Sequence, residues 1–267
     1  MTRILTLLTD FGLADYYVGA VKGTVLRLAP GTQLVDLSHE VPPGDVAGAA
    51  DLLAAAAPTF PPGTVHLAVV DPGVGSPRRL LVAQAGGHQF VAPDNGLLTP
   101  QLAAGAEAWS VTRRDLYLDA AEGGGSATFH GRDRFAPIAA ALLRGDHPNA
   151  LGLTIADAVR LTSPEPRRER EGEAWVLHGH VARVDRFGNL VTDIPGDWVA
   201  VGTAVVEVEG YRVARWVSHY AELGPGEAGT LIGSLGTVEL SLRDANLAAA
   251  WGVRRGAAVR ISQSPQG

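Results

Sequence analysis

The strongest constraint on the fold is an alternation of short apolar runs with alanine-rich amphipathic segments, which continues through roughly the first 165 residues. This alternation is typical of β–α units, in which helices cover a mostly parallel sheet. The predicted elements are strands over 4–8, 33–37, 65–70, 80–85 and 88–91, and helices over 17–28, 46–57 and 134–144. The first part of the chain therefore predicts an α/β domain with a mostly parallel sheet.

The pattern changes after residue 164. Residues 165–173 are charged, contain Pro166 and lack apolar periodicity, which is typical of an interdomain linker. Beyond them, short β-forming runs alternate with glycine turns, as in a small antiparallel barrel or sandwich. These runs lie at 174–184, 201–208, 211–216, 229–232, 237–242 and 257–261. We therefore expect an N-terminal α/β domain over 1–164, a linker over 165–173 and a smaller C-terminal antiparallel β domain, either a barrel or a sandwich, over 174–267.

Composition excludes several classes of protein. The net charge is -6, and no run rich in Lys and Arg is interleaved with aromatic residues, which argues against a nucleic-acid partner. The absence of cysteine excludes disulfides, thiolate zinc sites and cysteine nucleophiles. The apolar run at the start meets Asp10 too early for a signal peptide or a membrane span. We therefore expect a soluble, cytoplasmic protein.

The stretch 65–79 carries the strongest functional signal. A hydrophobic strand runs into Asp71, then into a loop of Pro and Gly, and then into Arg78 and Arg79. A carboxylate at the C-terminal end of a buried strand lies where open α/β sheets place their sites, and glycines there let the backbone approach a ligand. A guanidinium beside that carboxylate can hold a polar nucleophile or an anion, because its donors are fixed and it stays charged. Either arginine could supply it.

Other polar positions each have a functional and a structural interpretation. Asp10 ends the first predicted strand and could accept hydrogen bonds from ribose hydroxyls or cap the next helix. His39 could be a base, but such a histidine is more often a structural donor. His130 lies in a polar loop before a predicted helix, where an imidazole can exchange protons near neutral pH. Arg132 and Asp133 beside it are interpreted as a structural ion pair and cap.

Turns supply the remaining candidates. Asn95 stands at the tip of a predicted turn, and the turn itself is sufficient to explain it. In the second domain, Asp185 and Asn189 share one turn, where they could form an acceptor pair for an ammonium group or an Asx turn. The turns at 233–236 and 243–246 could face a carboxylate or a base edge with their backbone amides.

Eight sequence blocks, taken together, resemble the S-adenosyl-L-methionine hydroxide adenosyltransferases. Members of this family hydrolyse S-adenosyl-L-methionine (SAM) to adenosine and methionine, and they are related to fluorinating and chlorinating enzymes. The blocks run in order through both predicted domains, at 9–12, 18–23, 35–39, 69–75, 92–98, 128–133, 185–189 and 233–236. One block alone would be a weak signal, but eight collinear blocks are specific.

The resemblance implies an N-terminal α/β domain with a C-terminal antiparallel β-barrel, and it also implies a mechanism and an assembly. Asp71, Arg78 and His130 match the family's water-activating group, which acts on the ribose C5′ without a cofactor or a metal. The resemblance implies a homotrimer in which each site lies between the first domain of one subunit and the second domain of the next. We therefore expect a homotrimeric hydrolase whose partner is the small molecule SAM.

The resemblance also implies substrate contacts. Asp10 would bind the ribose diol, Asp185 with Asn189 would pair with the methionine ammonium, and Ser234 would reach the methionine carboxylate. The turn at 243–245 would meet the adenine edge, mostly through its backbone. The other residues implied to bind substrate are Asn95, Phe129, Arg243, Asp244 and Ala245.

A SAM-dependent halogenase of the same fold is the nearest alternative. The fluorinating enzymes have Tyr and Thr where this chain has Asp71 and Val74, and a fixed carboxylate would repel a halide. His130 and Gly131 replace a Tyr-Ser pair, which removes a halide-binding hydroxyl. The long insertion that those enzymes carry before the block at 92–98 is absent. Water is therefore the expected nucleophile.

Two alternatives from other classes remain. A metal-dependent hydrolase could use Asp10, His39, Asp71 and His130 as ligands, although an arginine in the same loop would compete with a cation. A module that binds SAM or adenosine without turnover would present the same pocket residues. Turnover of SAM, and its persistence in excess chelator, distinguish these alternatives.

Overall fold

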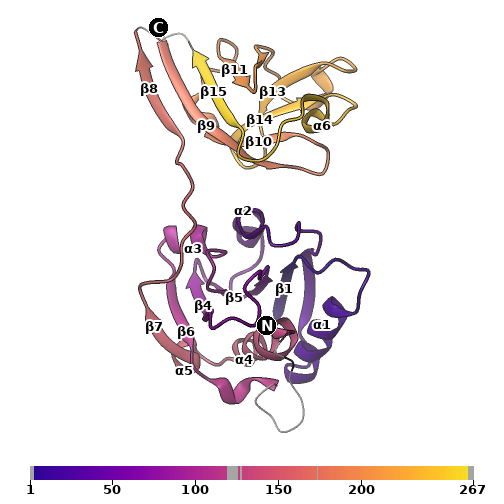
Figure 1. Cartoon of the computed structure of the whole chain (residues 1–267), viewed down its shortest axis with the longest axis vertical. Coiled ribbons are helices and arrows are strands. Elements are labelled where there is room, and N and C mark those ends of the chain that lie inside the picture. Colours follow the sequence, from indigo (N-terminus) through magenta and orange to yellow (C-terminus); the bar gives the residue numbers. More distant parts are fainter. Residues whose placement is uncertain (1–2, 119–125, 127, 173, 264–267) are drawn as a thin grey trace. The chain divides into compact units, whose positions relative to one another are not determined.

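The computed structural model describes residues 3–118, 126, 128–172 and 174–263. The chain divides into two compact units, Met1–Thr162 (unit 1) and Ser163–Gly267 (unit 2), and each encloses its own hydrophobic core (Figure 1). In the part of the chain described, no helix has the length and apolar character needed to cross a bilayer.

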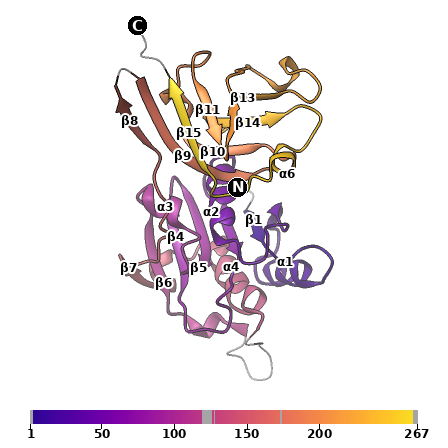
Figure 2. The same ribbon diagram turned by 45° about the horizontal axis from the view of Figure 1, so that its top comes forward.

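Unit 1 is built on a sheet that has seven strands in the described residues, in the order β2-β1-β3-β5-β4-β6-β7. The strands are β1 (Ile4–Thr9), β2 (Gln33–Ser38), β3 (Val65–Val69), β4 (Leu80–Ala85), β5 (His88–Pro93), β6 (Glu107–Val111) and β7 (Gly152–Ile155). Pairing is parallel from β2 to β5 and antiparallel from β5 to β7. Of these seven strands, β4 and β7 therefore oppose the common direction, and the predicted α/β class is confirmed. Figure 2 shows β7, β6, β4 and β5 side by side.

Helices cover both faces of this sheet. They are α1 (Tyr17–Leu28), α2 (Val46–Ala56), α3 (Thr99–Ala103), α4 (Ala136–Arg144) and α5 (Pro148–Leu151). Successive side chains of a strand point to opposite faces. Leu67 of β3 accordingly packs in the cluster that contains α1 and α4, whereas Ala68 packs in the cluster that contains α2 and α3. Because β3 is buried on both faces, its sequence is an almost unbroken apolar run rather than an alternating one.

Helix α4 begins two residues later than predicted, because a π-helical turn (η4, Gly131–Phe135) precedes it. The N–H of Ala136 donates to the carbonyl of Gly131, five residues back, and Pro137 has no N–H to donate. His130 lies at the start of this widened turn and is buried, and Phe135 at its end is fully buried.

Unit 2 is a nearly closed antiparallel barrel with a path β12-β11-β15-β9-β10-β14-β13, to which β8 adds by pairing with β9. Its elements are β8 (Arg167–Glu171), β9 (Ala174–Val184), β10 (Leu190–Pro195), β11 (Val205–Val208), β12 (Tyr211–Val213), β13 (Ala228–Ile232), β14 (Thr237–Leu242), α6 (Leu247–Trp251) and β15 (Ala258–Gln263). A bridge between Trp216 and Thr230 links the chain after β12 to β13. The predicted β-barrel is therefore confirmed.

The segment expected to be a linker, 165–173, instead contains strand β8, which pairs with β9 (Figure 1). The five residues of β8 are all exposed and charged, so the strand has no apolar face for a periodicity argument to detect. Charged side chains are typical of edge strands, since they discourage pairing with other chains. The Arg168 guanidinium stacks 4.0 Å from the centre of the Trp175 ring. The sequence pattern also does not predict β6, β7, β10, α3, α5 and α6.

A buried polar chain crosses the sheet of unit 1. The Thr6 hydroxyl lies 2.7 Å from His66 Nδ1, and His66 Nε2 lies 3.2 Å from His88 Nδ1. His66 is fully buried. Burial, and then the neighbouring His88, lower the pKa of His66 to about 3. His66 is therefore a neutral structural residue at physiological pH.

This depressed pKa predicts an acid-sensitive unit 1. In the unfolded chain His66 binds a proton below its ordinary pKa of 6.5. In the folded chain it binds that proton only near pH 3. The free energy of unfolding should therefore fall as the pH drops through that window, by up to about 1.4 kcal/mol per pH unit. His66→Gln should flatten the slope, as measured by denaturant unfolding at several pH values. Equal slopes in the two proteins would contradict this assignment.

Candidate active site

The three residues predicted to activate water come together at the C-terminal edge of the unit 1 sheet. Asp71 follows the end of β3, and Arg78 returns from the loop to face it. The Arg78 Nε lies 2.7 and 2.9 Å from the two carboxylate oxygens of Asp71, and its Nη2 also donates to Oδ2. The same Nη2 lies 3.1 Å from Nδ1 of His130. The guanidinium thus joins the carboxylate to the imidazole.

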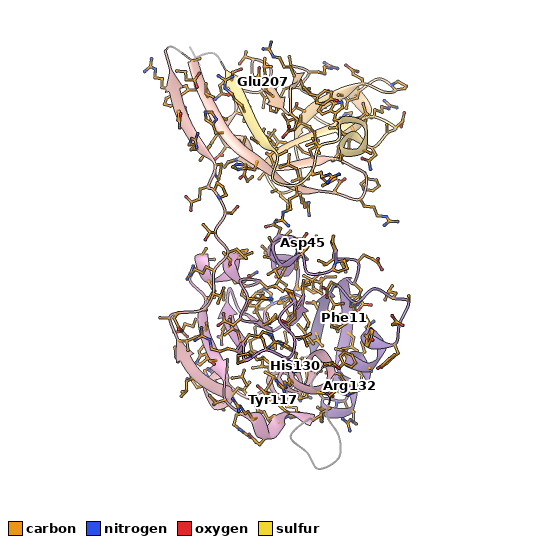
Figure 3. All side chains as sticks on the ribbon, viewed as in Figure 1. Phe11, Asp45, Tyr117, His130, Arg132 and Glu207 are labelled. Carbon is orange, nitrogen blue, oxygen red and sulfur yellow. The ribbon has the colours of Figure 1, made fainter. Side chains whose placement is uncertain are left out.

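This group is enclosed by protein. The side chains of Asp71 and Arg78 are 5% and 10% exposed, and His130 is 1% exposed. The Arg78 guanidinium lies 5.0 Å from the centre of the Phe135 ring, within the range of a cation–π contact. Figure 3 labels His130 with its neighbours Phe11 and Arg132. Electrostatic interactions are strong in such a site because little water remains to screen them.

The contact with Arg78 assigns the tautomer of His130. A guanidinium only donates hydrogen bonds, so Nδ1 must accept. The proton of the neutral ring therefore resides on Nε2. In this arrangement the basic nitrogen of His130 already has a donor, whereas the Asp71 carboxylate has further acceptor capacity.

The structure distinguishes the two neighbouring arginines. Arg79 Nε donates to Asp94 at 2.6 Å, and its terminal nitrogens donate to the side chain and the carbonyl of Asp157 at 2.8 and 2.9 Å. Arg79 therefore fastens the segment after β7 to the end of β5. Of the two, it is Arg78 that contacts Asp71 and His130.

Asp10 lies at the same sheet edge as Asp71, because Thr9 of β1 pairs with Val69 of β3. Its Oδ2 accepts from the N–H of Gly44 at 2.9 Å. Its Oδ1 has no hydrogen-bond partner among the residues described. A partly buried carboxylate with one free oxygen can accept a hydrogen bond from a ligand hydroxyl.

The block around His130 packs directly on the Asp10 turn. A Cβ added to Gly131 would lie 3.2 Å from the Phe11 ring, so a side chain at this position would push the two segments apart. Phe129 is 8% exposed, and its ring centre lies 6.2 Å from Phe11 and 5.1 Å from Tyr17. The structure gives Phe129 a packing role, and its contact with substrate stays a prediction.

Several polar residues near the site have structural partners. Asn95 donates to the carbonyl of Val70 at 2.9 Å, which ties its turn to the end of β3. Arg132 and the buried Asp133 form the expected ion pair at 2.6 Å. His39 Nδ1 lies 2.7 Å from the Thr9 hydroxyl, as expected of a structural histidine. In the described part of the chain, no group of three or more His, Asp or Glu side chains is arranged to hold a metal.

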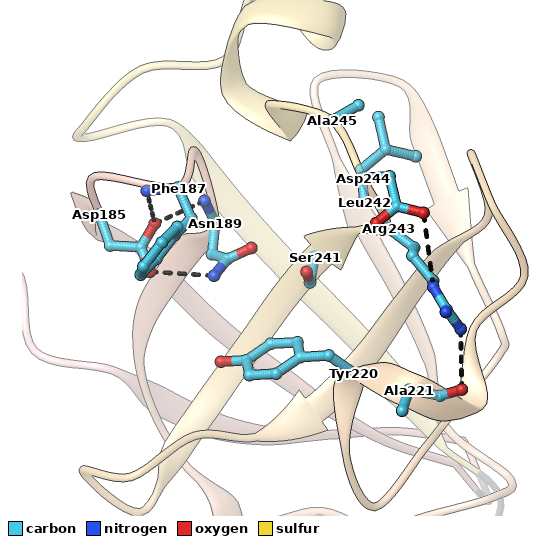
Figure 4. Close-up of a pocket in the computed structure, with 10 residues that line it drawn as sticks. All are labelled: Asp185, Phe187, Asn189, Tyr220, Ala221, Ser241, Leu242, Arg243, Asp244 and Ala245. Atoms are coloured by element: carbon cyan, nitrogen blue, oxygen red, sulfur yellow. Dashed lines mark hydrogen bonds and ion pairs between the residues drawn. The ribbon is translucent and has the colours of Figure 1, made fainter.

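Unit 2 contains a pocket of about 670 Å³, shown in Figure 4. Five of its lining residues are ones that the sequence predicts to bind substrate: Asp185, Asn189, Arg243, Asp244 and Ala245. The other lining residues are Phe187, Tyr220, Ala221, Ser241 and Leu242. Ser234 is not among them; it lies at the turn between β13 and β14.

Asp185 and Asn189 form a closed turn within this pocket. Asp185 Oδ1 accepts from the N–H groups of Phe187 and Asn189, both at 2.9 Å, and Oδ2 accepts from the Asn189 side chain at 2.9 Å. This is the predicted Asx turn, and it holds a negative charge at the pocket wall. Arg243 donates to the carbonyl of Ala221 at 2.9 Å and thereby braces the opposite wall.

Tyr220 and Phe187 are pocket residues that the sequence analysis missed. The Tyr220 hydroxyl donates to Glu239 Oε1 at 2.5 Å, and Glu239 is 6% exposed. Burial and the nearby charge of Asp185 raise the pKa of Glu239, while Tyr220 counteracts part of that shift. Phe187 is 77% exposed and lines the same pocket. Tyr220 lies outside the eight blocks, and Phe187 lies within the block at 185–189 but has no polar group that would single it out.

The fold and the site define a two-unit protein, with a buried Asp-Arg-His group in an α/β unit and an acidic, aromatic pocket in a β-barrel unit. The family models that match are the SAM hydroxide adenosyltransferase N-terminal domain, over residues 5–152, and the SAM hydroxide adenosyltransferase C-terminal domain, over residues 179–260. The chain belongs to the SAM hydroxide adenosyltransferase family.

Individual relatives agree with this assignment. The chain is 40% identical, over 98% of both chains, to an (R)-S-adenosyl-L-methionine hydrolase of Salinispora tropica. It is 30% identical to a fluorinase of Actinoplanes over 72% of this chain and 71% of the fluorinase. The crystal structure of an uncharacterized conserved protein from Thermotoga maritima matches with a TM-score of 0.86 and 33% identity, over 96% of this chain and 99% of that one.

Proposed function

We propose that this protein hydrolyses SAM to adenosine and L-methionine by attack of water on the ribose C5′. The observation that carries the proposal is the buried contact of Arg78 with both Asp71 and His130. Family membership and relatives named as SAM hydrolases support the same reaction. The protein is accordingly an enzyme that acts on a small molecule.

The chemistry of SAM explains why so few groups suffice. Its sulfonium is already a positively charged leaving group, so departure of methionine needs neither an acid nor a metal. The reaction needs an oxygen nucleophile that is held in line with the C5′–S bond and partly stripped of water. A water hydrogen-bonded within the buried Asp71–Arg78–His130 group meets both requirements.

Each member of this group has a distinct role in the proposal. Arg78 stabilises the hydroxide character that develops on the attacking oxygen. Asp71 receives the proton, because Nδ1 of His130 is already occupied by Arg78. His130 accepts from Nη2 of Arg78 with Nδ1 and thereby holds the guanidinium in place beside Asp71. Methionine leaves with the electron pair of the broken C–S bond as the new C–O bond forms.

The remaining contacts hold the two ends of the substrate. Asp10 accepts from the ribose diol with Oδ1, the carboxylate oxygen that the described residues leave unpaired. Asp185, with Asn189, pairs with the methionine ammonium, and the turn at 243–245 meets the adenine edge. Substrate contacts by Asn95, Phe129 and Ser234 stay predictions, because Asn95 and Phe129 have structural partners and Ser234 lies outside the pocket.

The same geometry disfavours a halide as nucleophile. A halide at the position of the attacking water would face the Asp71 carboxylate, which is 5% exposed. Two like unit charges at about 4 Å repel by about 4 kcal/mol at an effective dielectric of about 20, and the positive charge of Arg78, which is paired with Asp71, offsets part of this repulsion. A neutral water instead donates a hydrogen bond to the carboxylate.

The assembly that we propose is a homotrimer whose active sites combine unit 1 of one subunit with unit 2 of the next. The catalytic group and the acidic pocket lie in different units, so in this proposal one substrate molecule contacts residues of both units. A closed ring of identical subunits gives each site the same composition.

Isotope labelling tests the reaction itself. In water enriched in 18O, the label should appear at the 5′-hydroxyl of adenosine, as measured by mass spectrometry of the product. The assay includes an excess of chelator, in which turnover should persist. Unlabelled adenosine would exclude attack of water on C5′, and loss of turnover with chelator would favour the metal-dependent alternative.

The two arginines offer a matched pair of variants. Arg78→Gln, like Asp71→Ala and His130→Ala, should lower kcat about 10²–10⁴-fold, the range expected when a positioned proton-transfer or charge-stabilising group is lost. Arg79→Gln should instead lower the melting temperature while kcat stays within a few-fold of wild type, because the ion pairs of Arg79 are with Asp94 and Asp157. The reverse outcome would move the catalytic role to Arg79.

Co-expression of two inactive variants tests the shared site. Asp71→Ala damages unit 1 and Asp185→Ala damages unit 2, so mixed trimers should regain sites that contain neither change. Random assembly into a symmetric ring should restore about a quarter of wild-type activity. Activity no greater than that of the separate variants would exclude sites shared between subunits.

A further inference from the structure

A chain of four side chains in unit 1 takes no part in the proposed chemistry. The Thr9 hydroxyl lies 2.7 Å from His39 Nδ1, His39 Nε2 lies 3.0 Å from Asp36 Oδ1, and Lys22 Nζ donates to Asp36 Oδ2 at 2.6 Å. The chain runs from α1, across the end of β2, to the last residue of β1. Thr9 and His39 are 2% and 4% exposed. The side chains of Asp36 and Lys22 are 39% and 29% exposed, so it is the buried Thr9–His39 end that is restricted to one geometry.

For a neutral His39 ring, the donors and acceptors along this chain have one consistent arrangement. Burial acts to raise the pKa of Asp36, but hydrogen bonds from Lys22 and His39 outweigh it and hold that pKa below its usual value. The ionised carboxylate only accepts, so the proton of the His39 ring lies on Nε2 and Nδ1 is an acceptor. The Thr9 hydroxyl therefore donates to His39, which leaves its lone pairs for the N–H of Phe11 at 3.3 Å.

His39 holds the turn that carries Asp10 at two points. Its side chain binds Thr9, on one side of Asp10, and its carbonyl accepts from the N–H of Gly12, on the other side, at 2.8 Å. Gly12 has a φ of 66°, in the left-handed region, so the chain reverses sharply just after Asp10. The backbone on both sides of Asp10 is thus fixed by one residue of the neighbouring strand end.

We propose that His39 is a positioning residue of the substrate site, which aims the Asp10 carboxylate at the ribose hydroxyls through Thr9 and Gly12. Asp36 and Lys22 assist by fixing the His39 tautomer. The proposal rests on the ribose-binding role of Asp10 within the proposed function. Because a misplacement of about 1 Å in a substrate-holding group can cost about 10²-fold, loss of such support should be visible in binding.

Strand β1 provides an internal control for a purely structural role. Thr6, three residues before Thr9, makes the same contact with a histidine, since its hydroxyl lies 2.7 Å from His66 Nδ1. Thr6 and His66 are both fully buried. Thr6 is farther than Thr9 from Asp10 along the strand. Its hydrogen bond therefore stabilises the fold as that of Thr9 does, but it does not lie beside the substrate site.

The experiment compares Thr9→Val with Thr6→Val in the full chain. Both substitutions remove a buried hydroxyl donor, so both should lower the melting temperature by similar amounts. Only Thr9→Val should raise KM for SAM and weaken binding of the product adenosine, each by about tenfold, with kcat within about threefold of wild type. Binding of 2′,3′-dideoxyadenosine, which lacks the ribose diol, should be the same in Thr9→Val as in wild type. Isothermal titration calorimetry measures the dissociation constants of both nucleosides.

A pair of His39 variants adds a rescue test. His39→Asn places its amide near the position of Nδ1, where the oxygen can accept from Thr9, whereas the longer His39→Gln places its amide near the position of Nε2, where the nitrogen can donate to Asp36. His39→Asn should therefore bind adenosine more tightly than His39→Gln. Equal weakening in the two variants would count against the role of Nδ1.

Other outcomes separate this inference from the proposed function. Equal effects of Thr9→Val and Thr6→Val on adenosine binding, or equal weakening of adenosine and dideoxyadenosine by Thr9→Val, would overturn the positioning role. Asp10→Asn should weaken adenosine alone; unchanged adenosine binding in this variant would overturn both the ribose role of Asp10 and the inference. If wild type bound adenosine but did not hydrolyse SAM, the proposed function would fail, while the nucleoside comparison would still decide the role of His39.

Discussion

The ion pair between Asp71 and Arg78 is the interaction on which the catalytic half of the protein depends. Both side chains are nearly removed from water, and a buried charge is tolerated only when it is paired and hydrogen-bonded. Loss of either partner would leave an uncompensated buried charge, at a cost of about 3–5 kcal/mol. The pair therefore closes the loop between β3 and β4, and it also presents the guanidinium to His130. One contact supplies both the stability of the loop and the geometry of the site.

The sheet brings the other parts of this site to the same edge. Pairing of Thr9 with Val69 places Asp10 and Asp71 after neighbouring strands, and Asn95 binds the carbonyl of Val70, the residue before Asp71. The carboxyl ends of parallel strands are where open α/β sheets place ligands, because the loops there diverge and leave room. Residues such as His39 contribute to the site indirectly, by holding the turn that carries Asp10. A carboxylate on a turn is directed accurately only when the turn is itself held by rigid elements.

Much of this arrangement could be predicted from sequence, and the exceptions have physical causes. The helix expected over 17–28 and the strands expected over 80–85, 174–184 and 237–242 have those same bounds in the structure, since each has a clear apolar period. Strand β8 was missed because both its faces are charged. Arg78 and Arg79 could not be distinguished, because adjacent residues of an extended segment point in opposite directions and sequence alone does not say which one faces Asp71. Tyr220 was missed because its importance comes from Glu239, a partner on another strand.

The sequence by itself determined the α/β class of the first domain, the antiparallel β class of the second, the order of the motifs and the candidates Asp71, His130 and Asp10, because these depend on local periodicity and on residue type at strand ends and in loops. Only the tertiary structure decided that Arg78 is the arginine that holds Asp71, that Ser234 stays outside the unit 2 pocket, and that His39 serves the Asp10 turn. These three outcomes depend on distances between segments far apart in the chain. Such distances follow from how strands pair and pack, which no local pattern encodes.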